Sequence, residues 1–178
     1  MNLEQQKFPI GVFIKPNVIT KPIITDWIKI IATFPIEVKK ATQSLSDTQL
    51  DTPYRDGGWT IRQVVHHCAD SHMNSFIRFK LALTEENPTI KPYFEDCWAT
   101  FPDYTLHSIE SSIKILEGLH SRWETLLLNL DEIQLNRIFT HPEHGMQITL
   151  AENIGIYAWN CKHHLAHIVA LKQKENWN

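Results

Sequence analysis

Histidines gather in two segments of the sequence, and their spacing suits metal ligands on helices. The first segment carries His66-His67, and the second carries His164 four residues after Asn160. Side chains four residues apart lie one above the other on a helix, so both members of such a pair can converge on one ion. Imidazole nitrogen is a preferred ligand of zinc and related ions. The pattern therefore indicates metal binding between two helices, with an asparagine where a second histidine would complete the pair.

Helical periodicity gives the direction of each histidine in the second segment, since successive residues are about 100° apart around the axis. The apolar residues of this segment share one face. His164 borders that face on the same side as Asn160, whereas His163 and His167 lie further round. We therefore expect His164 and Asn160 beside the core, and His163 and His167 leaning toward solvent.

In the first segment, helical periodicity does not single out one histidine as the ligand. A polar stripe runs along one edge of its apolar face and consists of His67, Ser71, Asn74 and Arg78. His66 points away from the apolar face, and His72 points into it. Periodicity alone does not choose His67 over His72 as a ligand, and a solvated helix edge would show the same polar stripe.

The cysteines do not indicate a site of their own. Cys68, Cys97 and Cys161 lie far apart in the sequence and show no Cys-x-x-Cys spacing. This argues against a disulfide framework and against a thiolate zinc site. Cys68 and Cys161 fall on the core side of their segments, so we expect both to be small buried hydrophobic residues.

Four long amphipathic segments position these side chains. Apolar residues recur at helical spacing over residues 23–45, 60–84, 106–129 and 149–174. Thr60 and Thr149 each precede a Gln or Glu by three positions, which is the capping-box pattern that starts a helix. Pro35 is expected to kink or split the first helix. Helices of about 20 residues joined by long connections predict an all-α four-helix bundle.

The remaining segments are assigned from their turn residues. Residues 1–21 contain prolines and a glycine, and they predict an extended N-terminal arm along the domain surface. A loop rich in proline and aromatic residues spans residues 85–104. Weak alternation around Pro142-Glu-His-Gly145 predicts a small hairpin within residues 136–150, before the last helix.

Length and charge limit the class of protein. The 178 residues fit one domain, residues 1–178, with a net charge of −3 when the histidines are neutral. Lysine and arginine are scattered, so we expect no nucleic-acid partner. The N-terminus lacks the apolar core of a signal peptide, and no apolar run approaches the roughly 20 residues of a membrane span. We expect a cytoplasmic protein with reduced thiols and no membrane partner.

The stretch from Asp51 to Lys80, with Trp59-Thr-Ile-Arg-Gln-Val-Val-His-His67 at its centre, resembles the YfiT group of candidate metal-dependent hydrolases in the DinB-like superfamily. The resemblance extends over essentially the whole chain, including Pro9-Ile-Gly11 and Tyr157-Ala-Trp159. It implies a four-helix bundle that forms a homodimer. It also implies one divalent ion, zinc or nickel, held by a histidine of the second helix and a His-x-x-x-His pair of the last helix.

By motif, the three ligand positions of the family map onto His67, Asn160 and His164. Asn160 departs from the histidine of the family pattern, and an amide oxygen is a poor zinc ligand beside imidazole. Three outcomes are open. In the first, the site is weakened and uses the Asn160 oxygen and water as ligands. In the second, the site is rearranged and recruits His163 or His167. In the third, the protein holds no metal.

Three functions are compatible with these features. The first is metal-dependent hydrolysis of a small molecule, in which an open ligand position activates water and Asp70, one turn from His67, orients the ring. The second, implied by relatives in the superfamily, is S-transfer from a low-molecular-weight thiol such as bacillithiol. Arg78 and Lys80 would then meet the carboxylates of the thiol. The third is a metal-free binding or scaffold protein that kept the bundle and lost the site.

Overall fold

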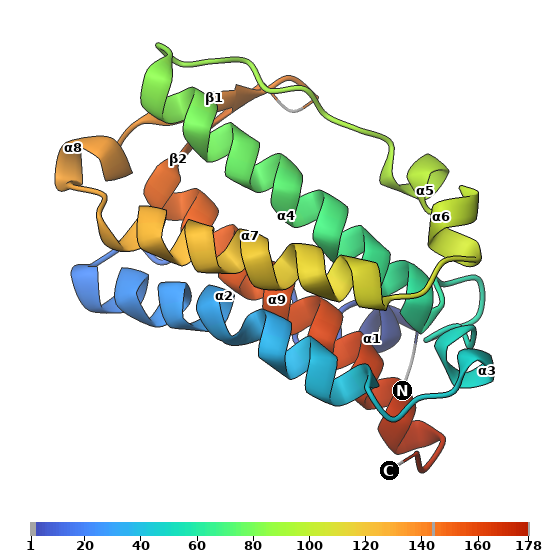
Figure 1. Cartoon of the computed structure of the whole chain (residues 1–178). Coiled ribbons are helices and arrows are strands. Elements are labelled where there is room, and N and C mark those ends of the chain that lie inside the picture. The colour runs from blue at the N-terminus through green and yellow to red at the C-terminus, as the bar shows by residue number, and fades with distance from the viewer. Residues whose placement is uncertain (1–2, 144, 178) are drawn as a thin grey trace.

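Four long helices dominate the structure, a computed structural model that describes residues 3–143 and 145–177 (Figure 1). They are α2 (Lys21–Thr42), α4 (Ile61–Thr84), α7 (Glu110–Leu128) and α9 (Leu150–Lys174). Within the described ranges, shorter helices and a hairpin connect or precede them: α1 (Leu3–Lys7), α3 (Asp47–Leu50), α5 (Glu95–Trp98), α6 (Pro102–Thr105), α8 (Glu132–Leu135), β1 (Ile138–His141) and β2 (Met146–Thr149). All four predicted long helices are confirmed, with their ends shifted slightly.

The long helices surround a common core. α2 packs on α7 and α9, and α4 packs on the same two helices. Figure 1 shows that α2 and α9 run in one direction, while α4 and α7 run in the other. Because α4 and α7 are parallel, the connection between them, residues 85–109, returns along the length of the bundle. The predicted four-helix bundle is thus confirmed, with a crossover between its second and third long helices.

The core is built from the apolar faces that periodicity predicts. Each long helix contributes large side chains that are fully buried, among them Ile31, Phe79, Trp123 and Ile154. Burial of one such side chain stabilises the fold by about 1.5–3 kcal/mol. Cys68 and Cys161 are also buried in the core as free thiols, which confirms their prediction as small hydrophobic residues.

Threonine caps set the starts of α4 and α9. Thr60 Oγ1 accepts from the Gln63 N–H at 3.1 Å and Gln63 Oε1 accepts from the Thr60 N–H at 2.8 Å, so this capping box is confirmed. At α9, Thr149 Oγ1 accepts from the Glu152 N–H at 3.1 Å. The second half of that predicted box is not formed, and the Glu152 carboxylate pairs with Lys15 Nζ at 2.7 Å instead. The ion pair ties the N-terminal arm to the start of α9.

Pro35 does not split α2, and this corrects the expectation from the sequence. The helix is continuous from Lys21 to Thr42 with Pro35 inside it. Proline has no backbone N–H, so it cannot donate the helical hydrogen bond to the Ile31 carbonyl four residues earlier. His120 of α7 supplies a donor instead, with its Nδ1 at 2.6 Å from the Ile31 oxygen. A ring from a neighbouring helix therefore satisfies the carbonyl that the proline leaves open.

The N-terminal arm lies along α9. Most of it is extended as predicted, but residues 3–7 form the short helix α1, which the sequence did not indicate. Trp159 Nε1 donates to the Gly11 carbonyl at 3.0 Å, and His167 Nε2 donates to the Lys7 carbonyl at 3.1 Å. These contacts place the arm over the face of α9 that carries the histidines.

The other connections are partly as predicted. The segment expected to be a loop over residues 85–104 contains the one-turn helices α5 and α6. The hairpin before α9 is confirmed, with β1 and β2 antiparallel and Phe139 opposite Ile148. Among the residues that the structure describes, no helix is long and apolar enough to cross a bilayer.

Candidate metal centre

His67 and His164 face each other between α4 and α9. The end of the bundle where α4 begins and α9 ends lies opposite the hairpin (Figure 1). Both rings are buried, with their centroids 4.9 Å apart and their planes at 65°. Trp59, just before α4, covers His67 with a centroid distance of 4.6 Å. The structure brings together two of the three residues predicted as ligands, and their binding of an ion remains a prediction.

Asn160, the third predicted ligand, contacts a core histidine. Its side-chain oxygen Oδ1 lies 2.9 Å from His72 Nε2. His72 Nδ1 lies 2.7 Å from His120 Nε2, and His120 Nδ1 donates to the Ile31 carbonyl. The prediction that His72 points into the core is confirmed, because its side chain is completely buried. Asn160 thus ends a chain of hydrogen bonds that crosses the core from α2 through α7 and α4 to α9.

His163 and His167 are buried, and this corrects the prediction that they lean toward solvent. They are 8% and 4% exposed. The His163 ring stacks on Trp159 at a centroid distance of 4.5 Å and lies 5.9 Å from the ring of Phe8. The His167 ring stacks on Tyr54 at 4.1 Å. Periodicity within α9 could not show that the N-terminal arm and the segment before α4 cover this face.

The three histidines of α9 form a compact group of nitrogen donors. One ring nitrogen from each of His163, His164 and His167 lies within 4.8 Å of the others. The Nδ1 atoms of all three, and that of His67, are buried and have no hydrogen-bond partner in the described part of the chain. Buried polar atoms in folded proteins nearly always have a partner. Three imidazoles grouped this closely, each with an unpartnered ring nitrogen, fit a divalent ion, which zinc proteins hold at about 2.0–2.1 Å from each nitrogen.

Burial keeps these rings neutral. Removal from water lowers the pKa of His67 to about 4, and the nearby His163 adds to that shift. Burial likewise lowers the pKa of His163 to about 4, with a smaller contribution from His167. The pKa of His164 is also well below its usual value, first because of burial and then because of the surrounding histidines. At neutral pH the rings therefore carry lone pairs that an ion can use.

A pocket of about 320 Å³ opens beside this group. Its lining joins the three α9 histidines to Tyr54, Arg55, Gly57, Trp59, Val64, Glu95 and Asp96. The two acidic residues belong to α5, which the crossover brings back to the end of the bundle where α4 begins (Figure 1). A cavity of this size, with one apolar side and a few charged groups, suits a small molecule.

The charged residues of the pocket were not found from the sequence. Arg55 lies in the turn before α4, and Glu95 and Asp96 lie in a segment predicted as a loop. No motif or periodicity linked them to the histidines, because the crossover alone brings α5 to this end. Arg78 and Lys80, expected to meet a thiol substrate, are not among the residues that line this pocket.

Asp70 and His66 have partners outside the centre. Asp70 Oδ2 accepts from the Tyr104 hydroxyl at 2.6 Å, so the expected orientation of His67 by Asp70 is not what the structure shows. His66, predicted to point away from the core, is buried with Nδ1 at 2.7 Å from Ser112 Oγ. That prediction was wrong because α7 packs against this side of α4.

Comparison with known proteins relates this chain to one protein family and to proteins of two Bacillus species. Residues 36–168 match the family described as the DinB superfamily. A protein of Bacillus mycoides (strain KBAB4) is 51% identical over 175 residues, which cover 98% of this chain and 100% of that protein. A protein of Bacillus cereus (strain 03BB102) is 53% identical over 171 residues, which cover 96% of this chain and 98% of that protein. Both are named as candidate metal-dependent hydrolases.

A solved structure is similar over nearly the whole chain. YfiT from Bacillus subtilis superimposes with a TM-score of 0.96 at 45% sequence identity, covering 98% of this chain and 99% of that one. It is described as a "probable metal-dependent hydrolase with an unusual four-helix bundle topology". The resemblance to the YfiT group that the sequence motifs indicated is therefore confirmed.

Proposed function

This chain belongs to the DinB superfamily, and from that membership we propose that it is a metal-dependent hydrolase acting on a small molecule. The observation that carries the proposal is the group of buried, unpartnered imidazole nitrogens beside the pocket of about 320 Å³. The names of the two Bacillus relatives and the description of YfiT support the same class of reaction.

The proposed ion is zinc or nickel, because imidazole suits both. We place it at His164, which belongs to two possible ligand sets. The set predicted from the sequence adds His67 and Asn160, whereas the group on α9 adds His163 and His167. Either set has three protein ligands, and three ligands leave a position open for water or substrate.

The chemistry of the pocket fits hydrolysis. A bound divalent ion supplies Lewis-acid activation of water and of a carbonyl or phosphoryl oxygen. The Arg55 guanidinium can bind an anionic group of the substrate. The carboxyl groups of Glu95 and Asp96 line the same pocket and can accept the proton that hydrolysis releases. The Trp59 indole covers one side with apolar surface and limits access of bulk water.

The test combines metal content with turnover of the purified, untagged protein. Mass spectrometry should find an equimolar divalent ion, and His164→Ala should lose it. His107→Ala is the matched control, because the His107 side chain is exposed. Activated esters or amides should be hydrolysed without any added thiol, and a chelator should stop the reaction.

Two results would change the assignment. Turnover that requires a low-molecular-weight thiol would replace hydrolysis by thiol S-transfer. A native protein with neither ion nor turnover would contradict metal catalysis and would leave a metal-free binding protein.

A further inference from the structure

The buried chain of hydrogen bonds accounts for Asn160 without an ion. The Ile31 oxygen can only accept, so His120 carries a proton on Nδ1 and, when neutral, a lone pair on Nε2. His72 Nδ1–H then donates to His120 Nε2, which leaves a lone pair on His72 Nε2. The structure places Asn160 Oδ1 2.9 Å from that nitrogen. A half-turn of the side-chain amide exchanges its oxygen and nitrogen, and in that orientation the Asn160 Nδ2–H can donate to the lone pair of His72 Nε2.

Asn160 is also shorter than the histidine of the family pattern. The two polar atoms of asparagine sit where Nδ1 and Cδ2 of a histidine would sit. Asparagine can therefore reproduce an Nδ1–H donor toward His72, but it has no atom at the more distant Nε2 position. Asn160 is also absent from the residues that line the pocket of about 320 Å³. Its contacts fit a role in the core better than a role as a metal ligand.

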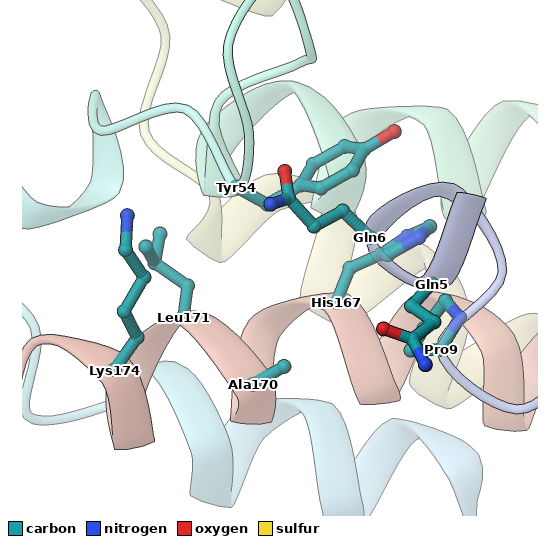
Figure 2. A pocket seen from close by; sticks show the side chains of 8 residues that line it. All are labelled: Gln5, Gln6, Pro9, Tyr54, His167, Ala170, Leu171 and Lys174. Atoms are coloured by element: carbon teal, nitrogen blue, oxygen red, sulfur yellow. The ribbon is translucent and has the colours of Figure 1, made fainter. Parts of the chain in front are cut away.

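His167 has the environment of a metal-binding histidine. Its Nε2 donates to the Lys7 carbonyl at 3.1 Å, which leaves the lone pair on Nδ1. That Nδ1 is buried and, within the described ranges, unpartnered. Metal-binding histidines commonly donate their other ring N–H to a carbonyl or carboxylate, which fixes the tautomer. Figure 2 shows His167 projecting from α9 between α1 and Tyr54.

We propose that the ion of this chain is bound by His163, His164 and His167 of α9, and that Asn160 serves the buried histidine chain instead. This inference rests on the proposed metal-dependent function. All three histidines line the pocket, so an ion held by them would meet the substrate directly. Three protein ligands would leave a further coordination position for water or substrate, as catalysis requires.

Titration of the metal-free protein with Co²⁺ tests the assignment, because the absorption spectrum of Co²⁺ reports both stoichiometry and coordination. His163→Gln and His167→Gln should each weaken Co²⁺ binding by at least about tenfold and change the spectrum. Asn160→Ala and His67→Ala should leave the affinity unchanged. Thermal melting of each metal-free variant, followed by circular dichroism, separates loss of a ligand from loss of the fold.

The outcomes distinguish the inference from the function on which it rests. If Asn160→Ala or His67→Ala loses Co²⁺ while His163→Gln and His167→Gln keep it, the ligand set implied by the family is used. The inference is then overturned and the proposed function stands. A native protein that takes up no Co²⁺ overturns both. If His163→Gln unfolds but His167→Gln stays folded, the result for His167→Gln decides, because the inference requires that this variant loses Co²⁺ binding.

Discussion

His120 Nδ1 donates to the Ile31 carbonyl across 2.6 Å, at the turn of α2 where Pro35 has no N–H to offer. A proline inside a helix usually costs about 3 kcal/mol or more, because it removes one hydrogen bond and crowds the carbonyl four residues earlier. Here the carbonyl gains a replacement donor, and the histidine gains a fixed tautomer. The contact also couples the packing of α2 on α7 to the polar chain that reaches Asn160.

Loss of the His120 ring should destabilise the fold strongly. His120→Ala would leave the Ile31 oxygen and His72 Nδ1 buried without partners, and we expect a loss of about 2–4 kcal/mol. Urea unfolding of the metal-free protein measures this value. The exposed His107→Ala is the control and should change stability by less than about 0.5 kcal/mol. A similarly small decrease in the free energy of unfolding of His120→Ala would show that the buried chain of hydrogen bonds contributes little to stability.

Replacing each of two glycines in the long helices by alanine should change the stability of the protein in opposite directions. A Cβ at Gly155 would lie 2.7 Å from Trp27 and 3.0 Å from Phe13, so Gly155→Ala should destabilise the protein by about 1–3 kcal/mol. A Cβ at Gly118 would meet nothing within 4 Å, so Gly118→Ala should stabilise it by about 0.5–1 kcal/mol. Thermal melting of both variants tests the pair. Equal changes in melting temperature for the two variants would show that the N-terminal arm and α2 do not pack tightly against α9 at Gly155.

Acid should destabilise the metal-free protein between about pH 6 and pH 4. Burial lowers the pKa of His67 and His163 to about 4 in the folded protein, against about 6.5 in the unfolded chain. As pH falls below the unfolded value, the unfolded chain binds protons that the folded chain does not, so stability decreases. The loss approaches about 1.4 kcal/mol per pH unit for each such histidine. Urea unfolding at several pH values measures how the free energy of unfolding changes with pH. This dependence should be weaker in His67→Gln. A free energy of unfolding that does not change between pH 6 and pH 4 in the native protein would contradict the expectation.

Removal of the first nine residues should weaken the metal site while the bundle remains folded. The deletion takes away the Lys7 carbonyl that accepts from His167 Nε2 and the Phe8 ring beside His163. Loss of such a supporting group typically lowers metal affinity by about 10–100-fold. Lys15→Ala is the control, because it breaks the ion pair of the arm with Glu152 but keeps the Lys7 carbonyl. Equal Co²⁺ affinity in the deletion and in the native protein would exclude a role for the arm.

The long helices could be predicted because their signals are local. Apolar spacing and the Thr60 cap depend on neighbours within a few residues, and the structure confirms both. The burial of His163 and His167 could not be predicted in the same way. It depends on Phe8, Lys7 and Tyr54, which are remote in sequence from α9.

The candidate centre was predictable only in part for the same reason. Periodicity placed His72 in the core and Asn160 at the edge of the apolar face of α9, but each was assigned within its own helix. The hydrogen bond between them depends on how α4 and α9 are rotated and shifted relative to each other. The acidic side of the pocket depends on the direction of α7, which no local pattern specifies.

The packing of α2 against α9 has a consequence for biosynthesis. These helices are separated in sequence by the whole of α4 and α7, yet they share an extensive interface in the folded bundle. A nascent chain that has not yet released residues 150–174 from the ribosome leaves the apolar faces of the first three long helices without part of their packing partner. His163, His164 and His167 belong to that last long helix, so the proposed metal site could form only after α9 has been synthesised and could not assist the earlier stages of folding.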